Sequence, residues 1–424
     1  MSFNFSKLLA KSGHKLALPN LHGSSDAYAL AQAASQLRAD KRMLTVFVAN
    51  PGDAQRLLDE IPWFEADLRC HLLPDWETLP YDAFSPHQDL VSERLATLHE
   101  IQNGNCDVLL VPATTALVRM APPSFLAAYT FFFKQGDTLD EAKLKSQLTL
   151  AGYSHVNQVM SPGEYSVRGG LIDLFPMGSV LPYRLDLFGD SIETIRTFDA
   201  DTQRSLYPVK EVRLLPGREF PMDEPARAAF RSRWRETFEG DPSRSAIYKD
   251  IGNGIASAGI EYYLSLFFDQ TATLLDYLPA NPYFALVGNI DEAIQRFWTD
   301  TRSRYQFLKS DRERPVLPPE TVFLRDEDFF AALKQHARWT IETSTPATPA
   351  SEISSFLPDI AVNRRADDPL TNLRAFLLQT DKRVMICAET LGRRETLQQY
   401  FNEYAIRLSL CEGYTDFATG SDKL

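Results

Sequence analysis

Few residues in this sequence belong to the types that build metal sites and disulfide frameworks. The 424 residues include four cysteines and seven histidines, with no Cys-x-x-Cys pair and no His-x-x-x-His pair. Zinc ribbons, disulfide scaffolds and helix-borne metal sites depend on such closely spaced pairs. We therefore expect no metal site, and isolated cysteines of this kind are typical of proteins of the reducing cytoplasm.

The sequence also has no long hydrophobic run and no excess of positive charge. Its longest apolar stretch, residues 125–133, is interrupted and far shorter than the ~20 residues that a membrane-spanning helix needs. The first residues lack the charged-then-apolar order of a signal peptide. The formal net charge of −12 argues against a protein coated with nucleic-acid-binding charge, although a local basic patch remains compatible with it.

What is present is enough apolar material for large cores. Hydrophobic residues make up 44% of the chain and aromatic residues 11%, and the length suggests about three domains. Residues 16–21, 43–49 and 107–111 read as strands, and residues 26–38, 54–61 and 114–120 as helices. Strands that alternate with helices predict a parallel sheet covered on both faces.

The pattern changes between residues 127 and 211. A helix is expected over 139–151, ending at Gly152, and strands over 165–175, 183–188 and 191–198. Gly189-Asp190 joins the last two strands and suits a type II′ hairpin, whereas Gly169 and Gly170 suggest a bulge or a close approach of the backbone. We therefore predict a small antiparallel α+β insert that interrupts an α/β domain made of residues 1–126 and 212–342.

Residues 343–355 are rich in Thr, Ser, Pro and Ala and read as a linker. Residues 356–424 then resemble the start of a small α/β domain, with helices at 370–379 and 392–404 and a strand at 383–388. A unit of this size with one or two strands is expected to be incomplete.

The insert carries the candidate binding residues. In a strand over 183–188, Arg184, Asp186 and Phe188 share one face and the apolar residues share the other. A large aromatic ring beside charges is typical of an interaction hot spot. Arg168 lies on a neighbouring predicted strand and adds a guanidinium group that can bind a carboxylate. The alternatives are a surface arginine and a satellite core residue.

A nucleotide site is the second candidate, at Gly23, Ser24 and Ser25, where a predicted strand turns into a helix. A phosphate-binding loop also needs a lysine, and the sequence contains no Gly-Lys-[Ser/Thr]. Asp26 places a negative charge where phosphates would lie. We therefore expect a degenerate site without catalysis, or an ordinary helix N-cap.

Arginine side chains form the third candidate, a possible contact with DNA. Arg227, Arg231 and Arg235 are spaced four residues apart, so they share one face of a predicted helix. The alternative, favoured by Glu224, Glu236 and Glu239 on either side of the row, is a solvated face in which arginine and glutamate side chains pair.

Three long motifs resemble the family of bacterial transcription-repair coupling factors (Mfd). They are Leu-Pro-Asp-Trp-Glu-Thr-Leu-Pro-Tyr-Asp-Ala-Phe-Ser-Pro-His-Gln-Asp at 73–89, Gly-Glu-Tyr-Ser-Val-Arg-Gly-Gly-Leu-Ile-Asp-Leu-Phe-Pro-Met-Gly at 163–178, and Leu-Pro-Tyr-Arg-Leu-Asp-Leu-Phe at 181–188. The resemblance implies a UvrB-like module, that is, a helicase-like domain with a degenerate nucleotide site and an insert that docks UvrA through Arg168, Arg184 and Phe188.

The resemblance also implies a non-catalytic role for this chain in transcription-coupled nucleotide excision repair. RNA polymerase, double-stranded DNA, ATP and magnesium are expected to bind only through family domains whose motifs are missing here. Two alternatives remain, a cryptic ATPase or helicase lobe and a DNA-binding scaffold. The first predicts saturable nucleotide binding, and the second predicts DNA affinity that falls steeply with salt.

Overall fold

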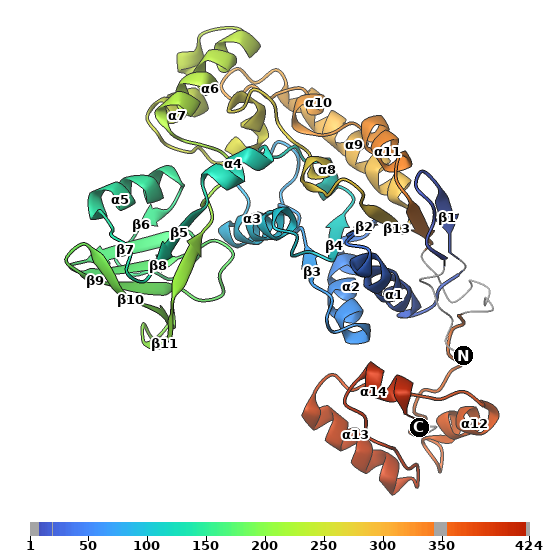
Figure 1. Ribbon diagram of the computed structural model, residues 1–424. Coiled ribbons are helices and arrows are strands. Elements are labelled where there is room, and N and C mark those ends of the chain that lie inside the picture. The colour runs from blue at the N-terminus through green and yellow to red at the C-terminus, as the bar shows by residue number, and fades with distance from the viewer. Residues whose placement is uncertain (1–7, 19, 343–353, 421–424) are drawn as a thin grey trace.

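The computed structural model describes residues 8–18, 20–342 and 354–420. The predicted linker, residues 343–355, lies almost entirely outside the described residues. Figure 1 shows a central α/β body, a separate antiparallel sheet beside it, and a small group of C-terminal helices near α1 and α2. No helix among the described residues is long and apolar enough to cross a membrane.

The body is built on a six-stranded parallel sheet. Its strands, in spatial order, are β1 (Lys15–Ala17), β14 (Arg338–Ile341), β13 (Tyr283–Val287), β2 (Leu44–Val48), β4 (Val108–Pro112) and β3 (Cys70–Leu72). Every residue of β2 and β4 is buried, as expected for central strands of a parallel sheet that is covered on both faces. The expected α/β class is therefore confirmed.

Helices cover the two faces of this sheet. One face packs against α1 (Ser25–Ala39) and α2 (Pro51–Phe64), and the other against α3 (Gln88–Gln102), α9 (Ile290–Leu308) and α11 (Asp326–Lys334). Strands β13 and β14 follow the antiparallel region in sequence, yet they pair within the same sheet as β1 to β4. The chain therefore returns to the body after the insert.

Two boundaries in the body differ from the sequence prediction. The strand expected over 16–21 ends at Ala17, and the helix expected over 114–120 is only a 3-10 turn, η2 (Thr115–Leu117). Val118 and Met120 instead form isolated bridges with Phe323 and Ala272. Tertiary pairing has therefore replaced the local helical preference there.

The insert contains a second six-stranded sheet, in the order β11 (Ser205–Val209), β10 (Ser191–Phe198), β9 (Tyr183–Phe188), β8 (Leu171–Phe175), β7 (Glu164–Arg168) and β6 (Ser154–His155). All pairs are antiparallel except β6 with β7. Helix α5 (Glu141–Leu150) precedes β6. Gly152 lies just after the end of α5 and has a φ of 95°, as expected for a glycine that ends a helix. The expectation of an antiparallel α+β insert is confirmed.

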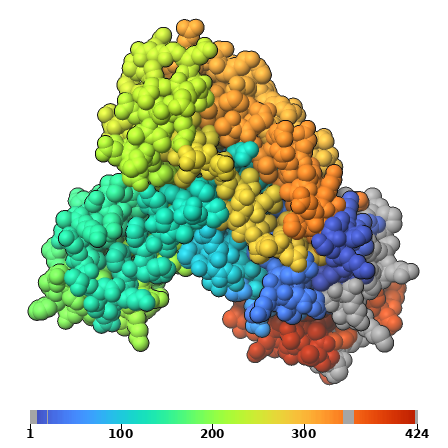
Figure 2. All heavy atoms as spheres, turned by 45° about the horizontal axis from the view of Figure 1, so that its top comes forward, coloured from blue at the N-terminus to red at the C-terminus, as the bar shows by residue number. Residues whose placement is uncertain are grey.

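Tight turns connect the strands of the insert, and a pair of short strands marks its two ends. Gly189 has a φ of 65° between β9 and β10, as a type II′ turn needs. Gly169 and Gly170 form a turn between two strands, so the single strand expected over 165–175 is in fact β7 and β8. Strands β5 (Phe131–Lys134) and β12 (Glu211–Leu214) pair where the chain enters and leaves the insert. The insert protrudes from the body in Figure 2.

The remaining helices of the body lie mostly between the insert and α9. They are α4 (Pro123–Ala128), α6 (Glu224–Thr237), η3 (Pro242–Arg244), α7 (Ala246–Gly252), η4 (Ile260–Leu266), α8 (Leu274–Tyr277) and α10 (Pro319–Val322). Aromatic rings dominate this region, and Phe230, Trp234 and Tyr263 are almost fully buried. The region extends the core that α3 shares with the sheet.

The C-terminal unit is helical in its described part. It contains α12 (Thr371–Gln379), α13 (Leu391–Glu403) and α14 (Tyr414–Thr419), and no strand forms between residues 354 and 420. The strand expected over 383–388, and with it an α/β unit, is therefore wrong for these residues. An extended segment becomes a strand only when a neighbour pairs with its backbone.

Candidate binding surface on the inserted sheet

The register of the inserted sheet decides which side chains share a face. Arg184 of β9 lies opposite Asp173 of β8, and Arg168 of β7 lies opposite Leu171. Side chains two residues apart on one strand point the same way. Arg168, Asp173, Arg184 and Phe188 therefore lie on one face, which we call the outer face. The prediction that Arg184 and Phe188 share a face is confirmed, and the register places Arg168 on the same face.

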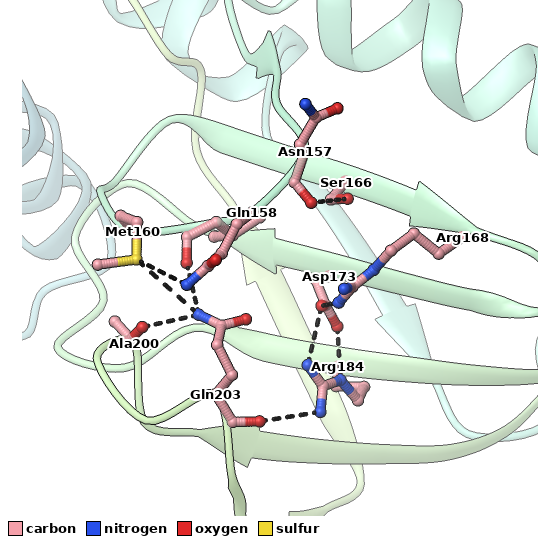
Figure 3. A network of polar contacts seen from close by, with 10 residues as sticks. Asn157, Gln158, Met160, Ser166, Arg168, Asp173, Arg184, Ala200 and Gln203 are labelled. Atoms are coloured by element: carbon pink, nitrogen blue, oxygen red, sulfur yellow. Dashed lines mark hydrogen bonds and ion pairs between the residues drawn. The ribbon is translucent and has the colours of Figure 1, made fainter.

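Asp173 joins the two predicted arginines (Figure 3). Its carboxylate accepts hydrogen bonds from Arg184 Nε at 2.7 Å and Arg184 Nη2 at 2.9 Å. The oxygen that accepts from Arg184 Nη2 also accepts from Arg168 Nη2 at 2.6 Å. The Asp173 side chain is only 1% exposed. A buried carboxylate with two guanidinium partners is well compensated, because both of its oxygens are hydrogen-bonded.

Arg184 makes further contacts besides those to Asp173. Its Nη1 donates to the main-chain oxygen of Gln203 at 3.3 Å, and its guanidinium carbon lies 4.7 Å from the centre of the Phe198 ring. The hydrogen bonds to Asp173 raise the pKa of Arg184. Only 18% of its side chain is exposed. Arg184 therefore lies on the outer face but is largely covered there, which differs from the exposed position expected of a docking residue.

A second small core explains why Arg184 is covered. Phe175 and Phe198 are buried on the outer face together with Val159, beneath the loops before β7 and after β10. The Gln203 side chain ties these loops together through the main-chain oxygens of Val159 and Ala200. One end of the outer face is thus covered by loops.

The other end of the outer face is open. The Arg168 side chain is 53% exposed and makes no hydrogen bond to described residues besides that to Asp173. Phe188 is 79% exposed at the hairpin that ends in Gly189. A large apolar ring exposed to water beside a tight turn is a feature of protein-binding surfaces. Arg168 and Phe188 are therefore the accessible members of the predicted set.

Asp173 is the site residue that the sequence analysis missed. A signal was present, because Asp173 stands between Ile172 and Leu174 in a predicted strand and therefore faces away from their core. Alternation alone does not predict that two arginines from neighbouring strands meet at this carboxylate, since that depends on the register.

The predicted degenerate nucleotide site lies at the start of α1. Ser25 donates its hydroxyl to the main-chain oxygen of His22, and Ser24 makes no capping hydrogen bond with its side chain. Asp26 forms a two-pronged ion pair with Arg56 of α2, at 3.0 and 2.6 Å. The carboxylate therefore occupies the position that the sequence analysis assigned to phosphates.

Further acidic side chains surround Arg56. It also contacts Glu60 at 2.9 Å and Asp53 at 3.5 Å, and these carboxylates, Asp26 first, raise the pKa of Arg56. The cavity beside the turn is lined by Asp26, Asp53, Glu60 and Arg56, so carboxylates outnumber the guanidinium group. A polyphosphate would meet net negative charge here.

The predicted row of arginines on α6 packs toward α7. Arg227 Nη1 donates to the main-chain oxygen of Gly252, the Arg231 guanidinium lies 4.8 Å from the centre of the Tyr248 ring, and Arg235 Nη1 donates to the Tyr248 hydroxyl. These contacts differ from the arginine–glutamate pairing named as the alternative. All three arginine side chains therefore make contacts within the protein. A contact of these arginines with DNA stays a prediction.

No group of three or more His, Cys, Asp or Glu side chains in the described part of the chain is arranged to hold a metal ion. The four cysteines carry free thiols. Burial raises the pKa of Cys70 to about 12, which disfavours its thiolate.

Comparison with known proteins assigns two segments. Residues 131–220 match the model of the UvrB interaction domain, and residues 376–424 match the model of the D3 domain of Mfd. The outer face, with Arg168 and Phe188, lies within the first of these segments.

Comparison of the whole chain with known proteins gives relatives of a single kind. The chain is 42% identical over 394 residues to the transcription-repair-coupling factor of Escherichia coli K12, and 39% identical over 390 residues to that of Haemophilus influenzae. These alignments cover 92% and 91% of this chain, and 34% and 33% of the two relatives. The factor of Bacillus subtilis is 27% identical over 308 residues. The chain thus spans about a third of the length of these relatives, and over the aligned residues it belongs to the transcription-repair-coupling factor family.

Proposed function

We propose that this chain is the part of a transcription-repair-coupling factor that recruits UvrA, and that it contributes no catalytic residue. The observation that carries the proposal is Phe188, an exposed ring on the same face as the exposed Arg168, within the segment that matches the UvrB interaction domain. The ring fills an apolar pocket on UvrA, and Arg168 pairs with an acidic group next to that pocket.

We further propose the domain division that this function requires. Residues 1–126 and 212–342 form one helicase-like domain with a degenerate nucleotide site, residues 127–211 form the UvrA-docking insert, and residues 356–424 form a separate small unit. The shared parallel sheet and the paired strands β5 and β12 at the base of the insert support this division.

In the whole protein, the insert would bring UvrA to a stalled RNA polymerase in the cytoplasm. Contacts with polymerase and double-stranded DNA, and the binding of ATP and magnesium, are assigned to regions outside these residues. The carboxylates around Arg56 support the absence of nucleotide chemistry in this part, because they oppose a bound polyphosphate.

Binding of purified UvrA to the immobilised chain tests the proposal. Phe188→Ala should weaken binding by about 2–4 kcal/mol, the usual effect of losing a central aromatic anchor. The matched control is Phe307→Ala on α9, where the ring is 86% exposed but lies outside the insert. Thermal melting should show both variants folded, since neither ring is part of the core.

Three results would contradict the proposal. Equal affinities of the wild type and Phe188→Ala would remove the docking role of the outer face. Saturable ATP binding by the wild-type chain would favour the alternative of a cryptic ATPase lobe, and salt-sensitive DNA binding without UvrA binding would favour a DNA scaffold.

A further inference from the structure

The three predicted docking residues differ in what they can offer to a partner. Phe188 is 79% exposed and the Arg168 side chain 53%, whereas the Arg184 side chain is 18% exposed. Arg184 donates hydrogen bonds from Nε and Nη2 to Asp173 and from Nη1 to the main-chain oxygen of Gln203. The two-pronged pairing with the buried Asp173 carboxylate and the low exposure of the side chain therefore leave Arg184 little of its guanidinium group to offer to a partner carboxylate.

We propose that Arg184 and Asp173 are positioning residues and that Arg168 makes the charged contact with the partner. This inference rests on the proposed function of the outer face. The partner surface is then one acidic group beside one apolar pocket, in place of two acidic groups that flank a pocket.

The shared oxygen of Asp173 gives the physical link. It accepts from Arg168 Nη2 at 2.6 Å and from Arg184 Nη2 at 2.9 Å, so the two guanidinium groups meet at one atom. Arg184 neutralises Asp173 and fixes its orientation through the second oxygen. Asp173 in turn fixes the end of the long Arg168 side chain, whose loss of rotamer freedom would otherwise be a cost of binding.

Charge supports the same assignment. Within the cluster of Arg168, Asp173 and Arg184, two guanidinium groups and one carboxylate leave a net charge of one positive unit. That charge lies at Arg168, because the Arg184 guanidinium is flanked by Asp173, Gln203 and the Phe198 ring. One acidic partner group is therefore enough to balance the charge of this cluster.

A double-mutant cycle on UvrA binding tests this inference. Arg168→Ala and Arg184→Ala should each lower affinity by about tenfold or more, as anchors of an interface do. Positioning predicts that Arg184→Ala has an effect of less than about twofold when Arg168 is already alanine, because the residue then has nothing left to orient. Asp173→Asn should behave in the same way as Arg184→Ala in both backgrounds. A direct contact by Arg184 predicts that its full loss persists in the Arg168→Ala background.

Arg196→Ala is the matched control. Arg196 lies directly opposite Arg184 on β10, on the same face, and it is exposed. Its removal should leave UvrA affinity unchanged if position, and not positive charge in general, decides binding. A loss at Arg196 similar to that at Arg168 would overturn the assignment of the charged contact.

Folding is checked by thermal melting of every variant, because Asp173→Asn leaves two guanidinium groups without their anion. If that variant does not fold, the Arg168 and Arg184 variants complete the cycle by themselves. The outcomes also separate the two proposals. A wild-type chain that fails to bind UvrA ends the proposed function, whereas binding with additive losses at Arg168 and Arg184 ends only the positioning role.

Discussion

The ion pair between Arg94 and Glu219 offers the sharpest test of how the insert is attached to the body. Arg94 of α3 is fully buried, and its Nε donates to Glu219 Oε1 at 2.8 Å. The guanidinium also donates to the main-chain oxygen of Pro74 and lies 5.2 Å from the Trp76 ring centre. Glu219 lies just after the strand by which the chain leaves the insert. The pair therefore ties that exit to the helix that covers the body sheet.

Glu219→Gln should strongly destabilise the folded chain. The amide keeps the volume of the side chain but leaves the Arg94 charge buried without an anion, which costs about 3–5 kcal/mol in comparable pairs. Glu211→Gln is the matched control, because the Glu211 pair with Lys134 is 3.5 Å long and more than half exposed on both sides. Its loss should cost less than about 1 kcal/mol.

Urea unfolding, followed by tryptophan fluorescence and circular dichroism, measures both changes. Replacing Arg94 and Glu219 together by methionine should recover most of the stability lost by Glu219→Gln, because no charge is then left buried. A Glu219→Gln midpoint equal to that of the Glu211→Gln control would refute the reasoning.

Three further outcomes follow from the same structure. Burial raises the pKa of Glu261 to about 7 from its ordinary value of 4.5, so the folded state holds this proton more tightly than the unfolded state. Stability should fall by up to roughly 3 kcal/mol as pH rises between these values, and urea midpoints of Glu261→Gln should lack that slope. Arg56→Ala leaves the Asp26 carboxylate unpaired and should lower the free energy of unfolding by about 1–3 kcal/mol without changing UvrA affinity. Tyr414→Ala removes a ring 5.7 Å from Trp63, the one exposed tryptophan of the five, and should increase acrylamide quenching of its fluorescence.

Local pattern was enough to predict most of the elements that carry the site. The apolar runs that became β2 and β4 could only be central strands, because their residues need cover on both faces. Gly189 predicted the hairpin after Phe188, since a positive φ is required there. The alternation of side chains along β9 was enough to place Arg184 and Phe188 on one face.

Pairing partners were beyond the reach of local pattern. The extended residues 383–388 read as a strand, but no neighbour pairs with them among the described residues. The arginine row of α6 read as a free face, but α7 folds back onto it and Tyr248 takes up two of its members. For residues 383–388 a pairing strand is lacking among the described residues, and for α6 a helix later in the sequence covers the arginines. Long-range contacts therefore decided the structure where the local sequence pattern predicted something else.

The sequence by itself determined that Arg184 and Phe188 share one face of an inserted strand, because alternation is a property of the strand backbone. Only the tertiary structure decided that Asp173 draws Arg184 inward and leaves Arg168 and Phe188 exposed. The register between β7, β8 and β9 places these charges together, and the loops over Phe198 cover one of them. Register and loop cover arise from long-range packing, so no single segment of sequence contains them.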